Sequence, residues 1–259
     1  MNIKKIVKEN LGENINYLIK GGFWLALLQG LLYSINLVIT IAFTHLASQY
    51  IYGQYRFVLS LLSTISVCSL IGMNVAIAQS TAKGYFGALK SGTYSKLRWS
   101  LLGTLIFVRL SIYFFLTRKE DGIWLILLMA AVAFPFLYGF EGITYYFNGM
   151  QEFKRLTISK FVLVGLPTFG ILITLLITQN LWYITGVFFF LSIITGLVVY
   201  IVVSKNVKSD KQDKDMDSYG KKLSFITGIT QVSDYLDHLL VAYYLGYTKL
   251  AIFAIANII

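Results

Sequence analysis

The sequence predicts an all-α polytopic membrane protein with about seven full transmembrane helices and a partial eighth. Hydrophobic residues make up 57% of the 259 residues and charged residues only 13%, well below the share of about 25% that is usual in soluble domains. The mean hydropathy is +0.69. The apolar residues also gather in runs of roughly 20, the length of helix that crosses a bilayer.

The first 20 residues differ from the runs that follow. Their apolar residues recur at helical spacing between lysines, which predicts an amphipathic cytoplasmic helix over residues 1–20. At the other end, the apolar stretch after Lys249 is too short to cross a bilayer, so we expect a cut-off eighth helix and a C-terminally truncated chain. Full spans are expected at 22–46, 57–79, 99–116, 123–146, 158–178, 181–203 and 223–245.

The positive charges indicate the orientation of these spans. The formal net charge is +10, and the lysines and arginines of alternate connections number 17 on one side and 4 on the other. Because basic loops stay in the cytoplasm, we expect a cytoplasmic N-terminus. A chain this apolar uses its basic residues for orientation, so nucleic acid is not an expected partner. All four tryptophans fall at predicted span ends, as in an interfacial aromatic belt.

The order of the spans suggests two units. Six spans form an N-terminal lobe over residues 21–203, and the charged stretch 204–222 is expected to be a solvated cytoplasmic linker. Residues 223–259 would then begin a second lobe with the seventh helix and part of the eighth. A repeat of this kind relates two halves by an axis along the membrane normal.

The seventh predicted span carries the most unusual polar residues. Gln231, Asp234 and His238 lie on one side of the helix, with Asp237 beside them. Charged groups inside a span must face protein or a wet cavity, so these residues are candidates for ion coupling, with Gln231 lining a cavity. A helix interface would explain the same stripe, and His238 could be only a hydrogen-bonded neighbour.

Other candidate cavity-lining residues lie on other spans. Gln29 and Asn36 share one face of the first span, although hydrogen bonds between helices would explain them equally well. Glu141 lies near the inner end of the fourth span, at a position suited to a cavity mouth. Arg109 and Asp234 have the same expected depth and could pair, either as a static bridge or as a gated one.

The sequence carries no sign of catalysis. It contains no P-loop, HExxH, CxxC or GxSxG motif, so we expect neither an enzyme nor a metal site. The single cysteine, Cys68, cannot form an internal disulfide. No cofactor is expected beyond a proton or sodium gradient.

Three stretches of the sequence carry a resemblance to a known family. The basic N-terminal helix, the connection NGMQEFKRLTISK and the stretch YGKKLSFITGITQVSDYLDHLLVAYYLGYTKLAIFAIA resemble the polysaccharide-synthesis branch of the multidrug/oligosaccharidyl-lipid/polysaccharide flippases. This resemblance implies two lobes of six helices in the bacterial plasma membrane, which move lipid-linked oligosaccharides outward by alternating access. It also implies that Asp234 or Asp237 couples ions and that Arg109 meets the carrier pyrophosphate.

The function expected on these grounds is the flipping of undecaprenyl-pyrophosphate-linked oligosaccharide for surface polysaccharides such as O-antigen or capsule. Expected partners are membrane lipids, the polysaccharide polymerase and the glycosyltransferases. The alternatives are a multidrug or metabolite cation antiporter of the same fold, an inactive fragment and a membrane transferase. The last would need a sizeable outer loop, whereas the outer connections are short.

Overall fold

The structure, a computed structural model, describes residues 3–117, 122–207 and 211–257, with side chains from residue 21 onward. All regular secondary structure within these residues is helical, which confirms the predicted all-α class. The helices are α1 (Ile3–Leu46), α2 (Gln49–Ile65), the 3₁₀ turn η1 (Ser66–Ser69), α3 (Gly72–Ala82), α4 (Ala88–Thr117), α5 (Ile123–Gly139), α6 (Gly142–Gly149), α7 (Phe153–Ile177), α8 (Leu181–Lys205), α9 (Met216–Leu245) and α10 (Tyr247–Ala256).

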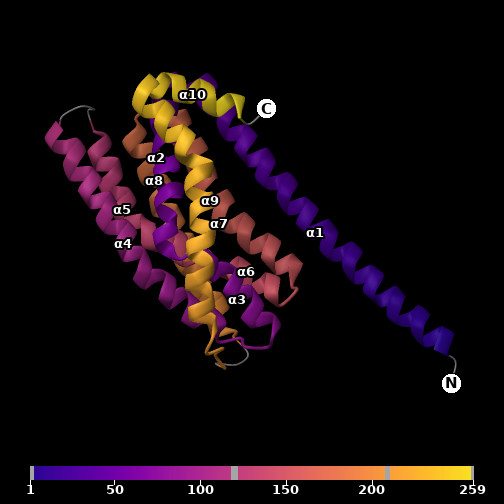
Figure 1. The fold of residues 1–259 in the computed structure, drawn as a ribbon. Helices are drawn as coiled ribbons and strands as arrows, with labels where there is room; N and C mark the ends of the chain where they lie inside the picture. The colour runs from indigo at the N-terminus through magenta and orange to yellow at the C-terminus, as the bar shows by residue number, and fades with distance from the viewer. Residues whose placement is uncertain (1–2, 118–121, 208–210, 258–259) are drawn as a thin grey trace.

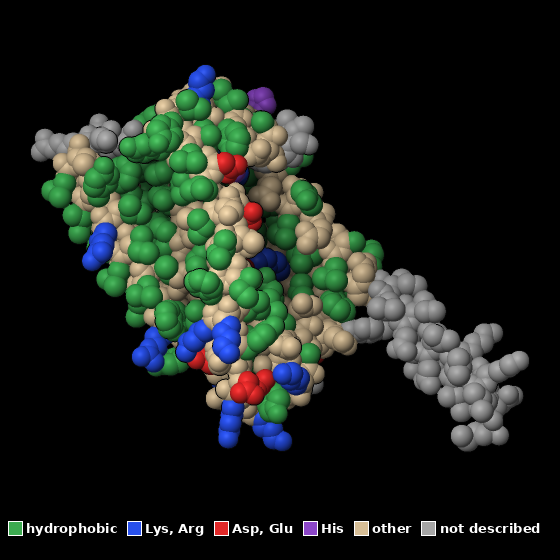
Figure 2. Space-filling model, in the orientation of Figure 1, with side chains coloured by type: hydrophobic (Ala, Val, Ile, Leu, Met, Phe, Trp, Pro, Cys, Tyr) green, Lys and Arg blue, Asp and Glu red, His purple; other side chains and the backbone are tan. Residues whose placement is uncertain are grey.

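The long helices run side by side as a bundle, with α10 lying across one end (Figure 1). The short helices α3 and α6 lie toward the opposite end, where α9 begins. Figure 2 shows lysine and arginine side chains gathered at this second end, which we call the basic end. Helix α1 packs mainly on α7 and leans away from the bundle toward its own N-terminus (Figure 1). The amphipathic pattern expected over residues 1–20 rests on side chains outside the described set.

Five of the described helices are long and apolar enough to cross a membrane, or six if the bent pair α2–η1 and α3 is one span. The expected seventh full span, 223–245, lies within α9, which does not meet the same test of length and apolarity. Its 30 residues would extend about 45 Å, enough to cross a bilayer, but they include aspartates, lysines, histidine and glutamine. The chain is a multi-pass membrane protein in which α9 is the unusually polar long helix.

The span expected at 57–79 is wrong as a continuous helix. The chain turns through 53° between the segments Gln49–Ser69 and Gly72–Ala82. At the break Leu70 adopts a left-handed conformation with φ of 55°, and the Ser66 and Ser69 hydroxyls donate to carbonyls three residues earlier. Hydroxyls that bond to the local backbone compete with the helical ladder, so this serine-rich stretch forms a 3₁₀ turn.

Two predicted span starts shift in a way that matters for the site. Helix α4 begins at Ala88 and α7 at Phe153, so Lys96 lies inside a helix and Lys160 two turns into one, although the charge count had placed both in connections. The expected span 123–146 is confirmed as one candidate span, Ile123–Gly149, with a two-residue interruption of the regular helix at Phe140 and Glu141, between α5 and α6. Pro135 lies one turn before this interruption, inside α5.

The described part of the connection between α8 and α9 contacts the end of α3 and the segment that joins α3 to α4. The Gly87 amide donates to the Lys211 carbonyl at 3.0 Å. The Asp213 carboxylate accepts from the Ser80 hydroxyl at 3.0 Å and lies 3.7 Å from the Lys83 ammonium. The backbone N–H of Asp215, followed by Ser80 and Lys83, lowers the pKa of Asp213.

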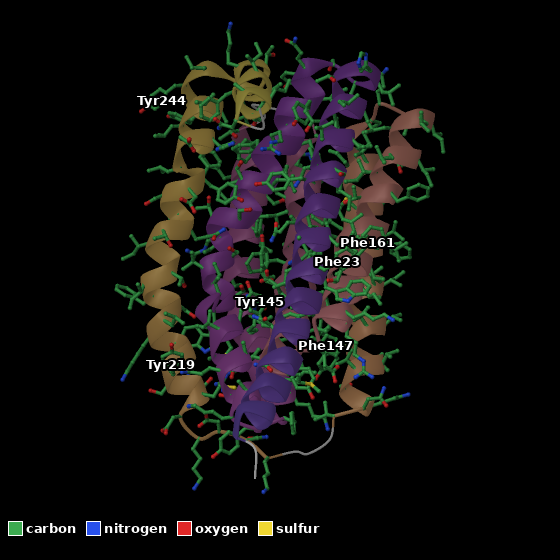
Figure 3. The ribbon with its side chains drawn as sticks, turned by 90° about the vertical axis from the view of Figure 1, so that its right-hand side faces the viewer. Phe23, Tyr145, Phe147, Phe161, Tyr219 and Tyr244 are labelled. Atoms are coloured by element: carbon green, nitrogen blue, oxygen red, sulfur yellow. The ribbon has the colours of Figure 1, made fainter. Side chains whose placement is uncertain are left out.

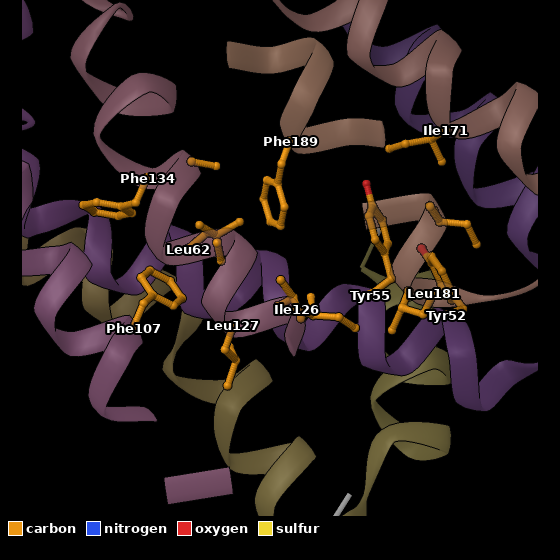
Figure 4. Close-up of a cluster of buried hydrophobic side chains, with 14 of the residues drawn as sticks. Tyr52, Tyr55, Leu62, Phe107, Ile126, Leu127, Phe134, Ile171, Leu181 and Phe189 are labelled. Atoms are coloured by element: carbon orange, nitrogen blue, oxygen red, sulfur yellow. The ribbon is translucent and has the colours of Figure 1, made fainter. Parts of the chain in front are cut away.

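The main hydrophobic core lies in the half of the bundle away from the basic end, between α2, α4, α5, α7 and α8. Figure 4 shows aromatic and aliphatic side chains of these helices meeting at its centre. Phe107 of α4 packs on Phe134 of α5 with ring centroids 5.5 Å apart. Both side chains are fully buried, so this contact fixes how α4 and α5 face each other.

Candidate functional site

The candidate site centres on Glu141, in the short turn between α5 and α6. The Phe140 amide reaches the Phe136 carbonyl at only 3.4 Å, and the bonds after it run from Ile143 and Thr144 to carbonyls three residues back. The α-helical ladder is therefore broken at Phe140 and Glu141. This break releases the Glu141 backbone from a straight helix and turns its side chain toward α3 and α4.

Two glycines let α3 approach its neighbours closely. A Cβ on Gly72 would lie 2.3 Å from the backbone nitrogen of Ser224 in α9, and one on Gly142 would lie 2.7 Å from the Cδ1 atom of Ile77. Helix α3 is thus packed between α9 on one side and α6 on the other. This packing holds Asn74 of α3 next to Glu141.

Four polar side chains from four segments form what we call the Lys–Glu cluster: Asn74, Lys96, Glu141 and Lys160. The Asn74 amide donates to Glu141 Oε2 at 2.9 Å, and the Lys96 ammonium donates to Asn74 Oδ1 at 2.5 Å. Lys96 Nζ also lies 3.7 Å from Glu141 Oε2. On the other side of the carboxylate, Lys160 Nζ lies 3.9 Å from Oε1.

The Lys96 side chain has no exposed surface. An ammonium group buried this completely is unfavourable unless a carboxylate and hydrogen-bond acceptors compensate it. Glu141 and Asn74 supply both. Lys160 and Glu141 keep side-chain exposures of 29% and 28%, so one end of the cluster is sealed and the other is open.

The open end faces a cavity of about 230 Å³ between α2, α5, α7 and α8. Glu141 and Lys160 are its charged lining groups, and Ser63, Tyr138, Thr168 and Ser192 add hydroxyls to a largely apolar wall. In the space-filling view the surface is hollowed beside α9, and a recessed lysine or arginine shows there (Figure 2). Tyr145, one turn beyond Glu141, lies in the interior between α9 and α1 in the side view (Figure 3).

The electrostatics of this arrangement favour an anion. Two ammonium groups surround one carboxylate, which leaves an excess positive charge beside an apolar cavity, where charge interactions are stronger than in water. Lys160 makes no hydrogen bond to any described residue, and its ion-pair partner among them is Glu141. Its N–H groups are therefore available to a phosphate or carboxylate. The described side chains form no cluster of three or more metal-binding residues.

The polar stripe of α9 does not join this cluster. Asp234 and Asp237 are exposed on the surface of the described structure. His238 is buried and faces Phe253 of α10, with ring centroids 5.1 Å apart. Its Nδ1 lies 3.0 Å from Asp237 Oδ1, while its buried Nε2 has no hydrogen-bond partner among the described residues. Figure 3 marks the two ends of α9 with Tyr219 and Tyr244.

The expected Arg109–Asp234 pair is absent from the ion pairs of the described residues. Phe107 and Ser111 are the buried positions on this part of α4, and Arg109, between them in sequence, is exposed. A helix places residues two apart on different faces. The sequence predicted the same membrane depth for Arg109 and Asp234, but the two side chains lie on helix faces that do not meet.

The structure brings Glu141 to the cavity and leaves the other predicted lining residues elsewhere. Gln29 and Asn36 are exposed on α1, and Gln231 is partly buried on α9. None of the three lines the cavity beside Glu141.

The sequence analysis missed Asn74, Lys96 and Lys160. The charge count had assigned both lysines to connections. The predicted span 99–116 began too late to include Lys96, whereas Lys160 was counted in the connection although the predicted span 158–178 contained it. One signal was available for Lys96: it shares the spacing of the positions of α4 that turn out to be buried, including Gly92, Ser100, Gly103 and Phe107. A lysine on the apolar side of a helix needs an acidic or carbonyl partner, which would have pointed to Glu141.

Comparison with known protein families identifies the chain at this point. A family model described as polysaccharide biosynthesis protein matches residues 18–259. Searches of curated proteins and of solved structures gave no significant match. The matched range contains the complete Lys–Glu cluster and all of α2 to α9. The chain therefore belongs to the polysaccharide biosynthesis protein family.

Proposed function

We propose that this protein flips undecaprenyl-pyrophosphate-linked oligosaccharide from the cytoplasmic to the outer leaflet during the synthesis of cell-surface polysaccharide. The family and the bundle of apolar helices indicate a membrane transport role in polysaccharide biosynthesis. The observation that carries the more specific proposal is the open end of the Lys–Glu cluster. There, Lys160 faces an apolar cavity without a hydrogen-bond partner among the described residues.

A pyrophosphate-linked lipid requires three different environments, and each has a counterpart here. Its phosphates need positively charged hydrogen-bond donors. Lys160 supplies such a group, and the buried Lys96 adds a second positive charge nearby. Its isoprenoid tail can stay in the bilayer, because many large apolar side chains of α7 and α8 are exposed. Its sugars would meet the hydroxyls of the cavity wall.

The remaining expectations form part of the same proposal. The basic end would face the cytoplasm of a bacterium, where glycosyltransferases build the substrate, and a polymerase would take the product outside. A proton or sodium gradient would drive alternating access, with Asp234, Asp237 and His238 as candidate ion-coupling groups. A cation antiporter would favour a net acidic cavity, whereas the Lys–Glu cluster beside this cavity holds two lysines and one glutamate.

The test is transport by the purified protein in liposomes. The substrate is a labelled sugar on an isoprenyl pyrophosphate, and a glycosidase added outside reports arrival at the outer leaflet. We expect Lys160→Gln to slow transport about tenfold to hundredfold, the effect of losing a hydrogen bond to a charged group. Lys154→Gln is the matched control, because Lys154 lies on the same helix over the Trp24 ring and outside the cavity.

Two results would contradict the proposal. One is unchanged sugar-lipid transport in Lys160→Gln. The other is exchange of an organic cation by the wild-type protein without any movement of the sugar lipid.

A further inference from the structure

The two oxygens of Glu141 have different surroundings. Oε2 accepts a hydrogen bond from Asn74 at 2.9 Å and lies 3.7 Å from Lys96. Oε1 lies 3.9 Å from Lys160, beyond hydrogen-bond distance. One oxygen is therefore held in place, while the other attracts a cation without a hydrogen bond to it.

Burial differs in the same direction. The Lys96 side chain is fully buried, whereas Lys160 and Glu141 are each exposed by somewhat more than a quarter and line the cavity. Asn74 bridges Lys96 and Glu141 with both ends of its amide. The Lys96 half of the cluster can thus stay intact if the Lys160 half opens.

The backbone at Glu141 allows such an opening. Glu141 lies in the turn between α5 and α6, where the hydrogen bonds run to carbonyls three residues back. A small rotation of this side chain would move Oε1 away from Lys160 without disturbing a regular helix. Lys160 lies inside the regular helix α7 and has no hydrogen bond to Glu141 Oε1, so the two groups can separate without a change in either helix.

We propose that Glu141 is an internal counter-anion that occupies Lys160 when the site is empty and that the phosphate group of the substrate displaces it. Asn74 and Lys96 hold the displaced carboxylate, so its charge stays compensated during the exchange. The competition weakens substrate binding and speeds release, which a carrier needs in order to turn over. This inference rests on the proposed function, since it concerns the same site.

Binding experiments can test the competition directly. The probe is a short-chain isoprenyl pyrophosphate without sugar, titrated into detergent-purified protein by calorimetry. We expect Glu141→Gln to bind the probe about tenfold more tightly than the wild type, because the competing negative charge is gone. Its transport of the full substrate in liposomes should nevertheless be slower, since release becomes limiting.

Two further variants separate this effect from damage to the fold. The double variant Lys96→Met with Glu141→Gln removes the positive charge of Lys96 together with its carboxylate partner, and it should still bind the probe more tightly than the wild type, although less tightly than Glu141→Gln alone. Glu152→Gln is the control: it removes a carboxylate that pairs with Arg155 and lies outside the cavity, and its affinity should equal that of the wild type.

The outcomes also distinguish the two proposals. If the wild type binds the probe and Lys160→Gln does not, while both variants that carry Glu141→Gln bind no more tightly than the wild type, only the counter-anion role is overturned. If neither the wild type nor any variant binds an isoprenyl pyrophosphate, both the counter-anion role and the proposed function are contradicted.

Discussion

The polar stripe of α9 and the Lys–Glu cluster are both charged features of a very apolar chain, yet the structure treats them differently. Asp234 and Asp237 stand out in the sequence and are exposed. Lys96 is inconspicuous in the sequence and is completely buried, with Asn74 and Glu141 as partners. The two regions differ in burial and in the number of partners, and not in how unusual their residues look.

This difference shows what makes a charged residue structurally important in such a bundle. A buried charge requires partners that replace its hydration, so its neighbours are constrained in turn. An exposed charge imposes no such constraint on the described residues. The cluster is therefore expected to contribute to both folding and binding, while the exposed Asp234 and Asp237 of α9 can contribute to function without supporting the fold.

The sharpest test of this comparison replaces one charge in each region. Lys96→Ala should lower the free energy of unfolding by about 3 to 5 kcal/mol, because it leaves a carboxylate without its buried partner. Asp234→Asn should leave stability nearly unchanged. Denaturant unfolding in detergent measures both variants. An equal loss in the two would show that exposure does not separate these regions.

Helix α3, which packs on both α9 and α6, is the place of a smaller expected effect. Gly72→Ala would force a Cβ against the backbone of α9 and should cost about 1 to 3 kcal/mol through overpacking. Gly142→Ala meets only the end of the Ile77 side chain, which can move, so it should cost less. Thermal unfolding of the two variants shows which one loses more stability. A larger loss in Gly142→Ala than in Gly72→Ala would mean that α3 is held mainly by its contact with α6.

The smallest effect concerns Asp213, an acidic residue outside the membrane spans that does have partners. Its pKa is lowered in the folded protein, so its contribution to stability is complete above its unfolded pKa, about 3.9. That contribution is lost as the pH falls through the lower folded value. Asp213→Asn should therefore reduce stability by less than about 1 kcal/mol near neutral pH.

The pH dependence of that variant supplies the check. The difference in thermal midpoint between Asp213→Asn and the wild type should stay constant from about pH 7 to pH 5 and disappear once the pH has fallen below the lowered folded pKa of Asp213. A difference that persists in acid would mean that the amide itself disturbs the connection between α8 and α9.

Several features were within reach of the sequence. The all-α class and the apolar helices followed from composition and run length. Glu141 was placed near a cavity from its position in an apolar run. The break at Leu70 was harder to foresee, because a serine-rich stretch inside a span can also remain helical when its hydroxyls bond to the preceding turn.

The sequence by itself determined the helical fold and one member of the site, because hydropathy and helical length are local properties of the chain. Only the tertiary structure decided that Lys96, Asn74 and Lys160 surround Glu141 and that Arg109 and Asp234 do not pair. Helical phase tells which residues share a face, but not which helix covers that face. That choice depends on close contacts such as Gly72 against Ser224, which join segments about 150 residues apart.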